Sequence, residues 1–220
     1  MEKPWSYSGA KQFENCPHLY DARYESKRIP FVETPEMAAG KRTHQKFYLR
    51  AHGDIPLPTE LEKYEPWLQK IESFGQVHAE LKIAITRDLR VVDYFDPAVW
   101  HRAGVDLCAV GATTIVAFDY KTGNPNFEDP FQGADYSACL LIRFPHIEKV
   151  AFANVWLRTG KLGQVHTYTR EKDLQNILTE MYSRADDIAR ARAAGKWPKL
   201  QSPLCKFCPD RTCEFNRSPR

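Results

Sequence analysis

Long apolar runs are missing from this chain of 220 residues. No stretch approaches the roughly 18 apolar residues of a membrane-spanning helix, and the first nine residues contain no hydrophobic core of a secretion signal. We therefore expect a cytoplasmic protein, or one in the host cytoplasm if a virus encodes it, with no membrane partner. The sequence also contains no internal repeat and no low-complexity segment, which excludes repeat architectures.

A strong charge of one sign is missing too, since the formal net charge is +3. That value is too small to indicate a nucleic-acid partner, although the segment after Lys196 is locally basic. Hydrophobic residues make up 43% of the chain and charged residues 27%, which is typical of one globular domain with a substantial core. Helical periodicity ends at 196–203, so we expect a main domain over 1–195 and a small appended element over 196–220.

Two aspartates and a lysine lie on a predicted β-hairpin near the middle of the chain. The β-rich runs Gly104–Val110 and Ile115–Tyr120 flank a four-residue connection, and the simplest pairing folds the chain at its centre. In that register Asp106 faces Asp119, with Cβ atoms roughly 4.5–5.5 Å apart. Lys121 points to the same face as Asp119, because side chains alternate along a strand.

This arrangement favours a divalent cation, because two adjacent carboxylates resist ionisation unless a positive charge lies between them. A bound Mg²⁺ or Mn²⁺ would polarise a phosphoryl oxygen and generate a nucleophile, while Lys121 would stabilise developing charge. The alternative is that Asp119 and Lys121 are exposed strand-end residues that lead into a turn. The spacing alone leaves both interpretations open.

Other polar residues occupy predicted elements on either side of the hairpin. Gly40-Lys-Arg-Thr-His44 lies in a helix that Thr34 and Pro35 begin. Glu80 lies in a predicted half-buried strand, in which polar residues alternate with apolar ones. That apolar set is Val77, Ala79, Leu81, Ile83 and Ile85. His44 could be an ordinary packed histidine, and Glu80 could pair with Lys82.

Two further helices are predicted around these elements. Thr59-Glu-Leu-Glu62 has the pattern of a capping box, which predicts a helix from Thr59 to about Gly75, with Pro66 as a kink or a late start. Glu128-Asp129-Pro130 predicts the start of a helix that runs to about Arg143. On it, Gln132 and Tyr136 lie four residues apart and share one face, although the tyrosine could simply pack into the core.

Three of the six cysteines cluster in Cys205-Lys-Phe-Cys208-Pro-Asp-Arg-Thr-Cys213. Without an export signal a disulfide framework is not expected, so this spacing indicates a metal site. Zinc and iron–sulfur sites both favour four thiolates. Cys16 follows a predicted helix on a loop-like break and is the best fourth ligand, whereas the other two cysteines lie in apolar runs and are expected in the core.

Taken together, these blocks resemble the RecB-like branch of the PD-(D/E)xK nuclease superfamily. The likeness covers Ser6 to Cys213 and comprises an N-terminal Cys-Pro helix, Gly-x-x-x-His, the hairpin with Asp-Tyr-Lys, and Gln-x-x-x-Tyr. It implies an α/β fold with a central mixed β-sheet flanked by helices on an αβββαβ restriction-endonuclease-like core. The implied activity is a Mg²⁺- or Mn²⁺-dependent DNA exonuclease that acts on single-stranded DNA or DNA ends in recombination, repair or DNA processing.

The resemblance also implies roles for individual residues. Asp106, Asp119 and Lys121 would be catalytic, and His44 and the Tyr120 carbonyl would help the two acids to hold the metal. Glu80 is a second-tier candidate, and Gln132 and Tyr136 would contact the substrate strand. Recombination or repair proteins would be the partners besides DNA. The sequence leaves the oligomeric state undetermined.

One N-terminal and three C-terminal cysteines resemble the iron–sulfur nucleases of CRISPR adaptation and the AddB-type repair nucleases. The resemblance implies that Cys16, Cys205, Cys208 and Cys213 hold a [4Fe–4S] cluster that joins the chain ends. The spacing between the last two is one residue shorter than the family pattern generally has, which leaves Zn²⁺ as an alternative. A non-catalytic nucleic-acid-binding module with a zinc or iron–sulfur site, and a structure-specific endonuclease, are the alternative functions.

Overall fold

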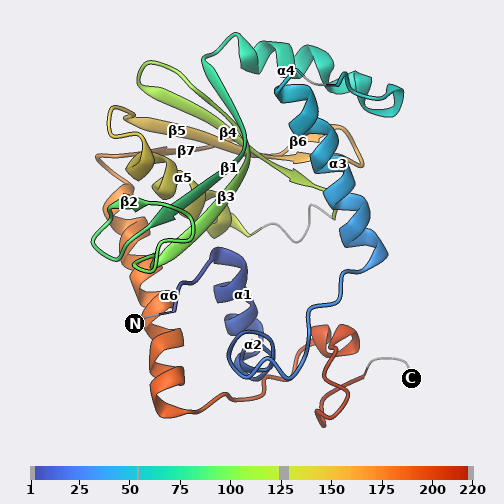
Figure 1. The fold of residues 1–220 in the computed structure, drawn as a ribbon, viewed down its shortest axis with the longest axis vertical. Coiled ribbons are helices and arrows are strands. Elements are labelled where there is room, and N and C mark those ends of the chain that lie inside the picture. The colour runs from blue at the N-terminus through green and yellow to red at the C-terminus, as the bar shows by residue number, and fades with distance from the viewer. Residues whose placement is uncertain (1–2, 54, 124–128, 218–220) are drawn as a thin grey trace.

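Seven strands form one mixed sheet at the centre of the protein, in a computed structural model that describes residues 3–53, 55–123 and 129–217 (Figure 1). The strand order is β2-β1-β3-β4-β5-β6, and β7 pairs with β5. Only β4 and β5 run parallel; the other recorded pairs are antiparallel. The strands are β1 Gln76–Ile85, β2 Val91–Val92, β3 His101–Val110, β4 Thr114–Lys121, β5 Lys149–Trp156, β6 Lys161–Leu162 and β7 His166–Thr169.

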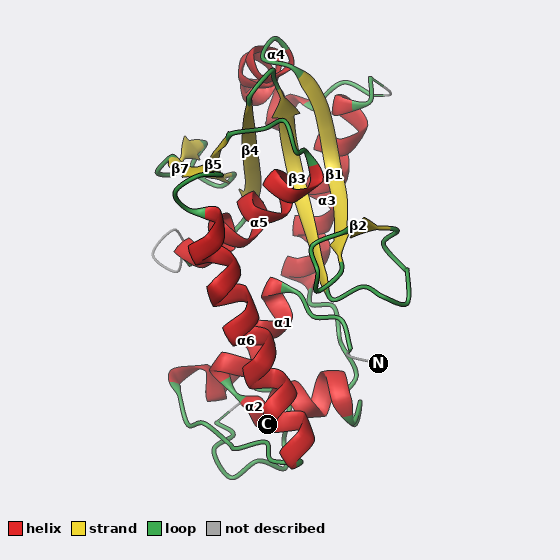
Figure 2. Ribbon diagram, turned by 90° about the vertical axis from the view of Figure 1, so that its left-hand side faces the viewer, coloured by secondary structure: helices red, strands yellow, loops and turns green. Residues whose placement is uncertain are grey.

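Helices cover both faces of this sheet (Figure 2). The α-helices are α1 Tyr7–Asn15, α2 Pro17–Tyr20, α3 Pro35–Ala51, α4 Glu65–Glu72, α5 Pro130–Arg143 and α6 Leu174–Ala194. Shorter helical turns are η1 Asp21–Glu25, η2 Thr59–Tyr64 and η4 Pro203–Phe207. The architecture confirms the expected α/β class with a central mixed sheet flanked by helices. Within the described residues, no helix combines the length and the apolar character that crossing a membrane requires.

The sheet separates two hydrophobic cores. α1, α5 and α6 pack against one face and form the first core, whereas α3, η2 and α4 pack against the other and form the second core. Large members of the first core are Trp100, Leu140, Leu141, Ile147 and Met181, and those of the second core are Phe47, Tyr64, Leu68, Leu107 and Phe118. Burial of these side chains holds the helices at fixed positions over the strands.

The central hairpin has the predicted register. Leu107 pairs with Phe118 and Val110 pairs with Ile115, and the Gly111 N–H donates to the Thr114 carbonyl at 2.9 Å to close the connection. The alternation of apolar residues and the short connection determine this pairing locally. One step beyond the last recorded pair, the same register brings Asp106 opposite Asp119.

Two helix starts were predicted correctly and one was not. The Thr34 hydroxyl accepts from Met37 N at 3.3 Å, and Asp129 accepts from Phe131 N at 2.9 Å; Glu128, named with Asp129 in that prediction, lies outside the described residues. The capping box predicted at Thr59 does not form, since 59–64 is a 3₁₀ turn without a side-chain cap. The α-helix starts late, at Glu65, because a proline at the next position is compatible only with a helix's first turn.

Strand β1 forms as predicted, but its apolar residues do not share one face. Ala79 and Ile83 are four residues apart, so strict alternation would place both side chains on one face. Ala79 contacts the second core, whereas Ile83 lies in the first core. The change occurs at Glu80, whose φ of 51° places a non-glycine residue in the left-handed region. The pairing of β1 with β3 is recorded on both sides of Glu80 but not at Glu80 itself. The strand therefore changes its orientation beside Asp106.

Candidate functional site

Asp106 lies on β3 and Asp119 lies on the neighbouring strand β4. An Asp106 carboxylate oxygen, Oδ2, accepts from the backbone N–H of Tyr120 at 2.7 Å, so the first acid is fixed against the strand that carries the second. Asp119 is buried, with 6% of its surface exposed. Because little water reaches it, the charge of Asp119 depends on its protein neighbours.

A hydrogen-bonded network joins Asp119 to three other predicted residues. Lys121 Nζ lies 2.6 Å from Asp119 Oδ2 and donates to Gln132 Oε1 at 2.6 Å. The Gln132 amide donates from Nε2 to Asp119 Oδ1 at 3.0 Å and to the Tyr136 hydroxyl at 3.1 Å. Gln132 and Tyr136 meet the strand residues because both project from one face of α5.

Helix α3 brings His44 to the opposite side of the two acids. His44 Nε2 lies 3.2 Å from the Tyr120 carbonyl oxygen, and Nδ1 lies 3.4 Å from Asp106 and 3.6 Å from Glu80. His44, Glu80 and Asp106 each present a ligand atom within 4.8 Å of the other two. These three residues could hold a metal ion, and we call them the acid cluster.

Glu80 reaches this cluster through its unusual backbone. A left-handed conformation in the middle of a strand costs energy for a residue with a side chain, and such strain tends to occur at functional sites. Lys82, the alternative partner of Glu80, lies instead over the ring of Tyr94 at 5.6 Å. Glu80 is therefore directed at His44.

The electrostatics of the site show an excess of negative charge. Burial raises the pKa of Asp119 to about 6, and the charge of Asp106 adds to this effect, whereas Lys121 and His44 oppose it. Burial lowers the pKa of His44, but its contacts with Asp106 and Glu80 outweigh that effect and raise the pKa to about 10. A positive charge is thus favoured at this position, whether on the imidazole or on a bound cation.

The phenols of Tyr120 and Tyr136 keep their protons. Burial raises the pKa of both hydroxyls, and nearby carboxylates raise them further, Asp106 for Tyr120 and Asp119 for Tyr136. Tyr136 can therefore donate a hydrogen bond to an anionic group that approaches Asp119.

A groove of about 790 Å³ opens beside the acid cluster. Its walls come from α3 and β1, and its lining includes basic, aromatic and amide side chains as well as His44 and Glu80. The lining residues beyond the cluster are Glu36, Met37, Gly40, Lys41, Gln45, Tyr48, His52, Ala79, Lys82 and Thr122. Asp106 and Asp119 are not among its lining residues, so a polymer bound in this groove would meet the acid cluster at His44 and Glu80.

The four predicted cysteine ligands meet at the other end of the molecule. Cys16, Cys205, Cys208 and Cys213 are all half-buried and line one hollow of about 180 Å³. Within the described residues, no three of their sulfur atoms lie within 4.8 Å of one another. Cys108 and Cys139 are fully buried, as expected of core residues, and burial raises the pKa of the Cys108 thiol to about 12.

Asp210 ties the two ends of the chain together around this hollow. Its Oδ2 accepts from Arg28 Nη1 at 2.9 Å and lies 3.1 Å from His18 Nε2. The backbone N–H of His18 donates to the Pro198 carbonyl at 3.1 Å. Sequence reasoning missed Asp210, although its position between two of the cysteines was a signal.

A second group of metal-ligand types was also missed. His101, Asp135 and Cys139 are fully buried and present ligand atoms within 4.8 Å of one another. His101 Nε2 lies 3.1 Å from Asp135 Oδ2, which joins the start of β3 to α5. The four-residue spacing of Asp135 and Cys139 was visible in the sequence, but the approach of His101 was not.

No protein-family model matches the chain, and no curated protein matches it. A solved structure from Eubacterium rectale described as "Putative exonuclease" matches with a TM-score of 0.55 and 14% identity, over 100% of this chain and 90% of that one. The structure of SSO0001 gives a TM-score of 0.49 at 13% identity, over 98% of this chain and 88% of that one, a score too low to support an argument. The first likeness shows that this chain shares its fold along its whole length with the Eubacterium rectale protein.

Proposed function

We propose that this protein is a metal-dependent nuclease of the RecB-like branch of the PD-(D/E)xK superfamily, which hydrolyses phosphodiester bonds of DNA. One observation carries the proposal. The network of Lys121, Asp119 and Gln132 lies near the acid cluster, since the charges of Asp106 and His44 act on Asp119, so an ammonium group and polar side chains of α5 adjoin a candidate cation site. A site that only bound phosphate would not gain from two carboxylates facing the backbone of a nucleic acid.

The donor set fits a hard divalent cation. Carboxylate and carbonyl oxygens with one imidazole suit Mg²⁺ or Mn²⁺, and the raised pKa values of Asp119 and His44 mark a site that favours added positive charge. Asp106, Asp119 and His44 would hold the ion, with the Tyr120 carbonyl and Glu80 as further ligands. When bound, such an ion acts as a Lewis acid and makes water a nucleophile near neutral pH.

The remaining residues act on the substrate itself. Lys121 carries an ammonium group at the acid cluster's edge, where it stabilises negative charge that develops on the phosphoryl oxygens and orients the attacking water. Gln132 offers an amide and Tyr136 a protonated phenol, both fixed by α5, and these groups position the strand through hydrogen bonds or stacking.

We propose exonuclease rather than endonuclease action, as the sequence resemblance implies, and the similar Eubacterium rectale structure is described as a "Putative exonuclease". Single-stranded DNA or DNA ends are the proposed substrates, in recombination, repair or DNA processing. The exonuclease and endonuclease alternatives separate on a covalently closed circular substrate, which has no end and which an exonuclease leaves intact.

A charge-removing substitution tests the chemistry. Lys121→Met keeps the length of the side chain, and we expect it to lower the rate of hydrolysis of labelled linear DNA with Mn²⁺ by about 10²- to 10³-fold. Asp119→Ala should act at least as strongly. Lys161→Met, at an exposed position of β6, is the matched control and should retain full activity. If wild type and all variants bind DNA and leave it intact, the protein is a binding module and not a nuclease.

We further propose a [4Fe–4S] cluster in the cysteine hollow. Tetrahedral zinc with Zn–S bonds of 2.3 Å would bring the sulfurs to about 3.8 Å from one another. Within the described residues no three of the four sulfurs lie within 4.8 Å of one another, and all four line one hollow, which supports a group larger than a single zinc ion. Such a group would bind Cys16 to the three C-terminal cysteines.

A further inference from the structure

Phe95 is a large aromatic ring that the fold leaves in water. It lies in the connection between β2 and β3, and 81% of its surface is exposed. Tyr94 packs against it edge to face, with ring centroids 5.3 Å apart and an interplanar angle of 87°. A scattered aliphatic residue at a surface needs no explanation, but an exposed ring that packs against a half-buried tyrosine is a candidate contact surface.

Two cations surround this aromatic pair. The guanidinium carbon of Arg102 lies 5.2 Å from the centre of the Tyr94 ring and 5.8 Å from that of Phe95. Lys82 Nζ lies 5.6 Å from the centre of the Tyr94 ring. We call Lys82, Tyr94, Phe95 and Arg102 the β2–β3 platform.

Backbone contacts hold the platform rigid. Arg102 Nε donates to the Tyr94 carbonyl at 2.8 Å, so the cation also fixes the segment that carries the rings. The Asp96 N–H donates to the Asp93 carbonyl at 2.9 Å and closes the turn that holds Phe95. A ligand that stacks on Phe95 would therefore lose little binding free energy in ordering the ring.

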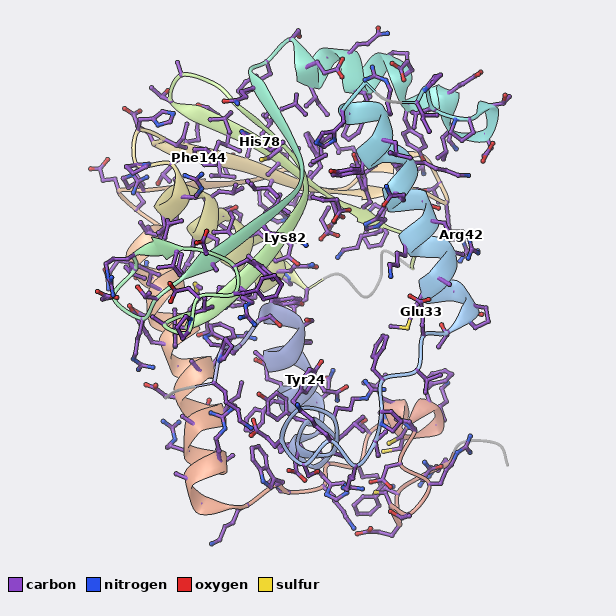
Figure 3. The ribbon with its side chains drawn as sticks, viewed as in Figure 1. Tyr24, Glu33, Arg42, His78, Lys82 and Phe144 are labelled. Atoms are coloured by element: carbon purple, nitrogen blue, oxygen red, sulfur yellow. The ribbon has the colours of Figure 1, made fainter. Side chains whose placement is uncertain are left out.

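The platform is continuous with the acid cluster. Lys82 belongs both to the platform and to the wall of the groove that contains His44 and Glu80. It lies two residues along β1 from Glu80, and Figure 3 shows it between the strands and α3. A chain molecule that contacts both Phe95 and Lys82 would therefore reach the groove that His44 and Glu80 line.

We propose that the β2–β3 platform binds a single strand of DNA on its way to the acid cluster, with a base stacked on Phe95 and phosphates beside Arg102 and Lys82. The inference rests on the proposed nuclease function and assigns the path of its substrate. An aromatic face flanked by cations is the usual surface for unpaired bases. Duplex DNA keeps its bases stacked on one another, so the platform selects single strands.

Binding can be measured apart from hydrolysis. A fluorescein-labelled oligothymidylate of about 15 nucleotides, a length that spans such platforms, is titrated with the full chain in Ca²⁺ without Mg²⁺ or Mn²⁺, and affinity is read from anisotropy. We expect Phe95→Ala to weaken binding by about 5- to 150-fold, which corresponds to the loss of one stacked base. Phe95→Trp should retain the wild-type affinity, and Phe95→Leu should behave like alanine.

A matched control separates the platform from any exposed ring near a cation. Phe207 is 74% exposed and lies 4.9 Å from Lys206 Nζ in the cysteine segment. Phe207→Ala should bind the oligonucleotide as the wild type does. Lys82→Met should reduce the slope of log affinity against log salt by about 0.7, the value for one phosphate contact on a single strand. Equal affinities of Phe95→Ala and wild type would overturn the inference, as would an equal loss with Phe207→Ala.

Two further outcomes distinguish this inference from the proposed function. If wild type does not hydrolyse DNA but its binding requires Phe95, the nuclease function is wrong and the platform stands. If wild type hydrolyses DNA and Phe95→Ala binds equally well, the function stands and the platform is wrong. A duplex bound as tightly as the single strand, with the same dependence on Phe95, would also overturn the inference.

Discussion

The acid site and the cysteine hollow lie at different parts of the fold and are stabilised in different ways. Asp119, Lys121 and Gln132 already contact one another through short hydrogen bonds, from strand β4 and helix α5. Within the described residues, Cys205 Sγ contacts Ser202 N at 3.4 Å and the Leu200 carbonyl at 3.9 Å, and the cysteine lies in the short 3₁₀ turn η4. The sheet and α5 hold the acid site in place, whereas we expect a bound metal group to stabilise the cysteine hollow.

The first prediction tests the dependence of the cysteine end on a bound group and has the largest expected effect. Cys205→Ser should abolish iron and acid-labile sulfide in anaerobically purified protein and destabilise residues 196–217 by several kcal/mol, because the binding energy of a structural metal is folding energy. Limited proteolysis would detect the loosened segment.

Activity should fall in the same variant. Helix α1 leads into Cys16 at one end and places Tyr7 against Tyr136 at the other, with ring centroids 6.4 Å apart. Cys108→Ala, a core cysteine outside the hollow, should retain the iron. Wild type that contains zinc and no iron would show that the cluster assignment is wrong.

The second prediction tests whether side chains alone stabilise the acid site's scaffold. Asp135→Leu leaves His101 fully buried without its partner, so the free energy of unfolding should fall by about 3–5 kcal/mol in urea titrations. The double variant with His101→Leu should recover much of that loss, because no polar group is then left unpaired.

Asp186→Leu provides the comparison for this substitution. Asp186 pairs with Arg87 at the surface of α6, and its removal should cost less than about 1 kcal/mol. A cost of Asp135→Leu no larger than that would show that the buried pair does not hold α5 to β3.

The third and smallest effect concerns the metal-free acid site. The pKa of Asp119 is about 6 in the folded protein and near its ordinary value of 3.8 in the unfolded chain. Its contribution to stability is therefore fully present below about pH 4 and is lost as the pH rises through about 6. At about pH 8, Asp119→Asn should be more stable than wild type by about 2–3 kcal/mol in EDTA.

This difference should disappear below about pH 3, where Asp119 is largely protonated in both states. Saturating Mn²⁺ should reverse its sign, since the ion favours the ionised carboxylate that asparagine lacks. Thermal unfolding of both proteins across this pH range, with and without Mn²⁺, measures the stability difference at high pH, its loss at low pH and its reversal by the metal. A wild type that is more stable than the asparagine variant in EDTA at high pH would contradict the proposed excess of negative charge.

The sequence predicted the hairpin well because its information is local. Alternation and a four-residue connection specify the pairing of Leu107 with Phe118, and the opposition of Asp106 and Asp119 follows from that register. The i and i+4 spacing likewise specified the shared face of Gln132 and Tyr136, which the structure directs at Asp119. The helix predicted from Thr59 begins only at Glu65, which is the late start that Pro66 indicated, whereas the predicted capping box at Thr59 does not form.

The break of β1 at Glu80 could not be predicted from the sequence. Alternation along 77–85 continues without interruption, yet the two halves of the strand pack into different cores. The change coincides with the left-handed backbone of Glu80 and with a matching change on β3, where Val105 lies in the first core and Leu107 in the second. The pair of His101 and Asp135 was invisible in the sequence because its members are 34 residues apart.

The sequence by itself determined the strands, the hairpin register and the chemical types of the candidate ligands, because neighbouring residues decide propensity, turns and side-chain alternation. Only the tertiary structure decided that α3 brings His44 to Asp106, that Glu80 turns toward both, and that Asp210 joins the chain ends beside four cysteines. Those contacts connect residues far apart in the chain, and the burial of the two cores on either side of the sheet supplies the free energy that brings them together.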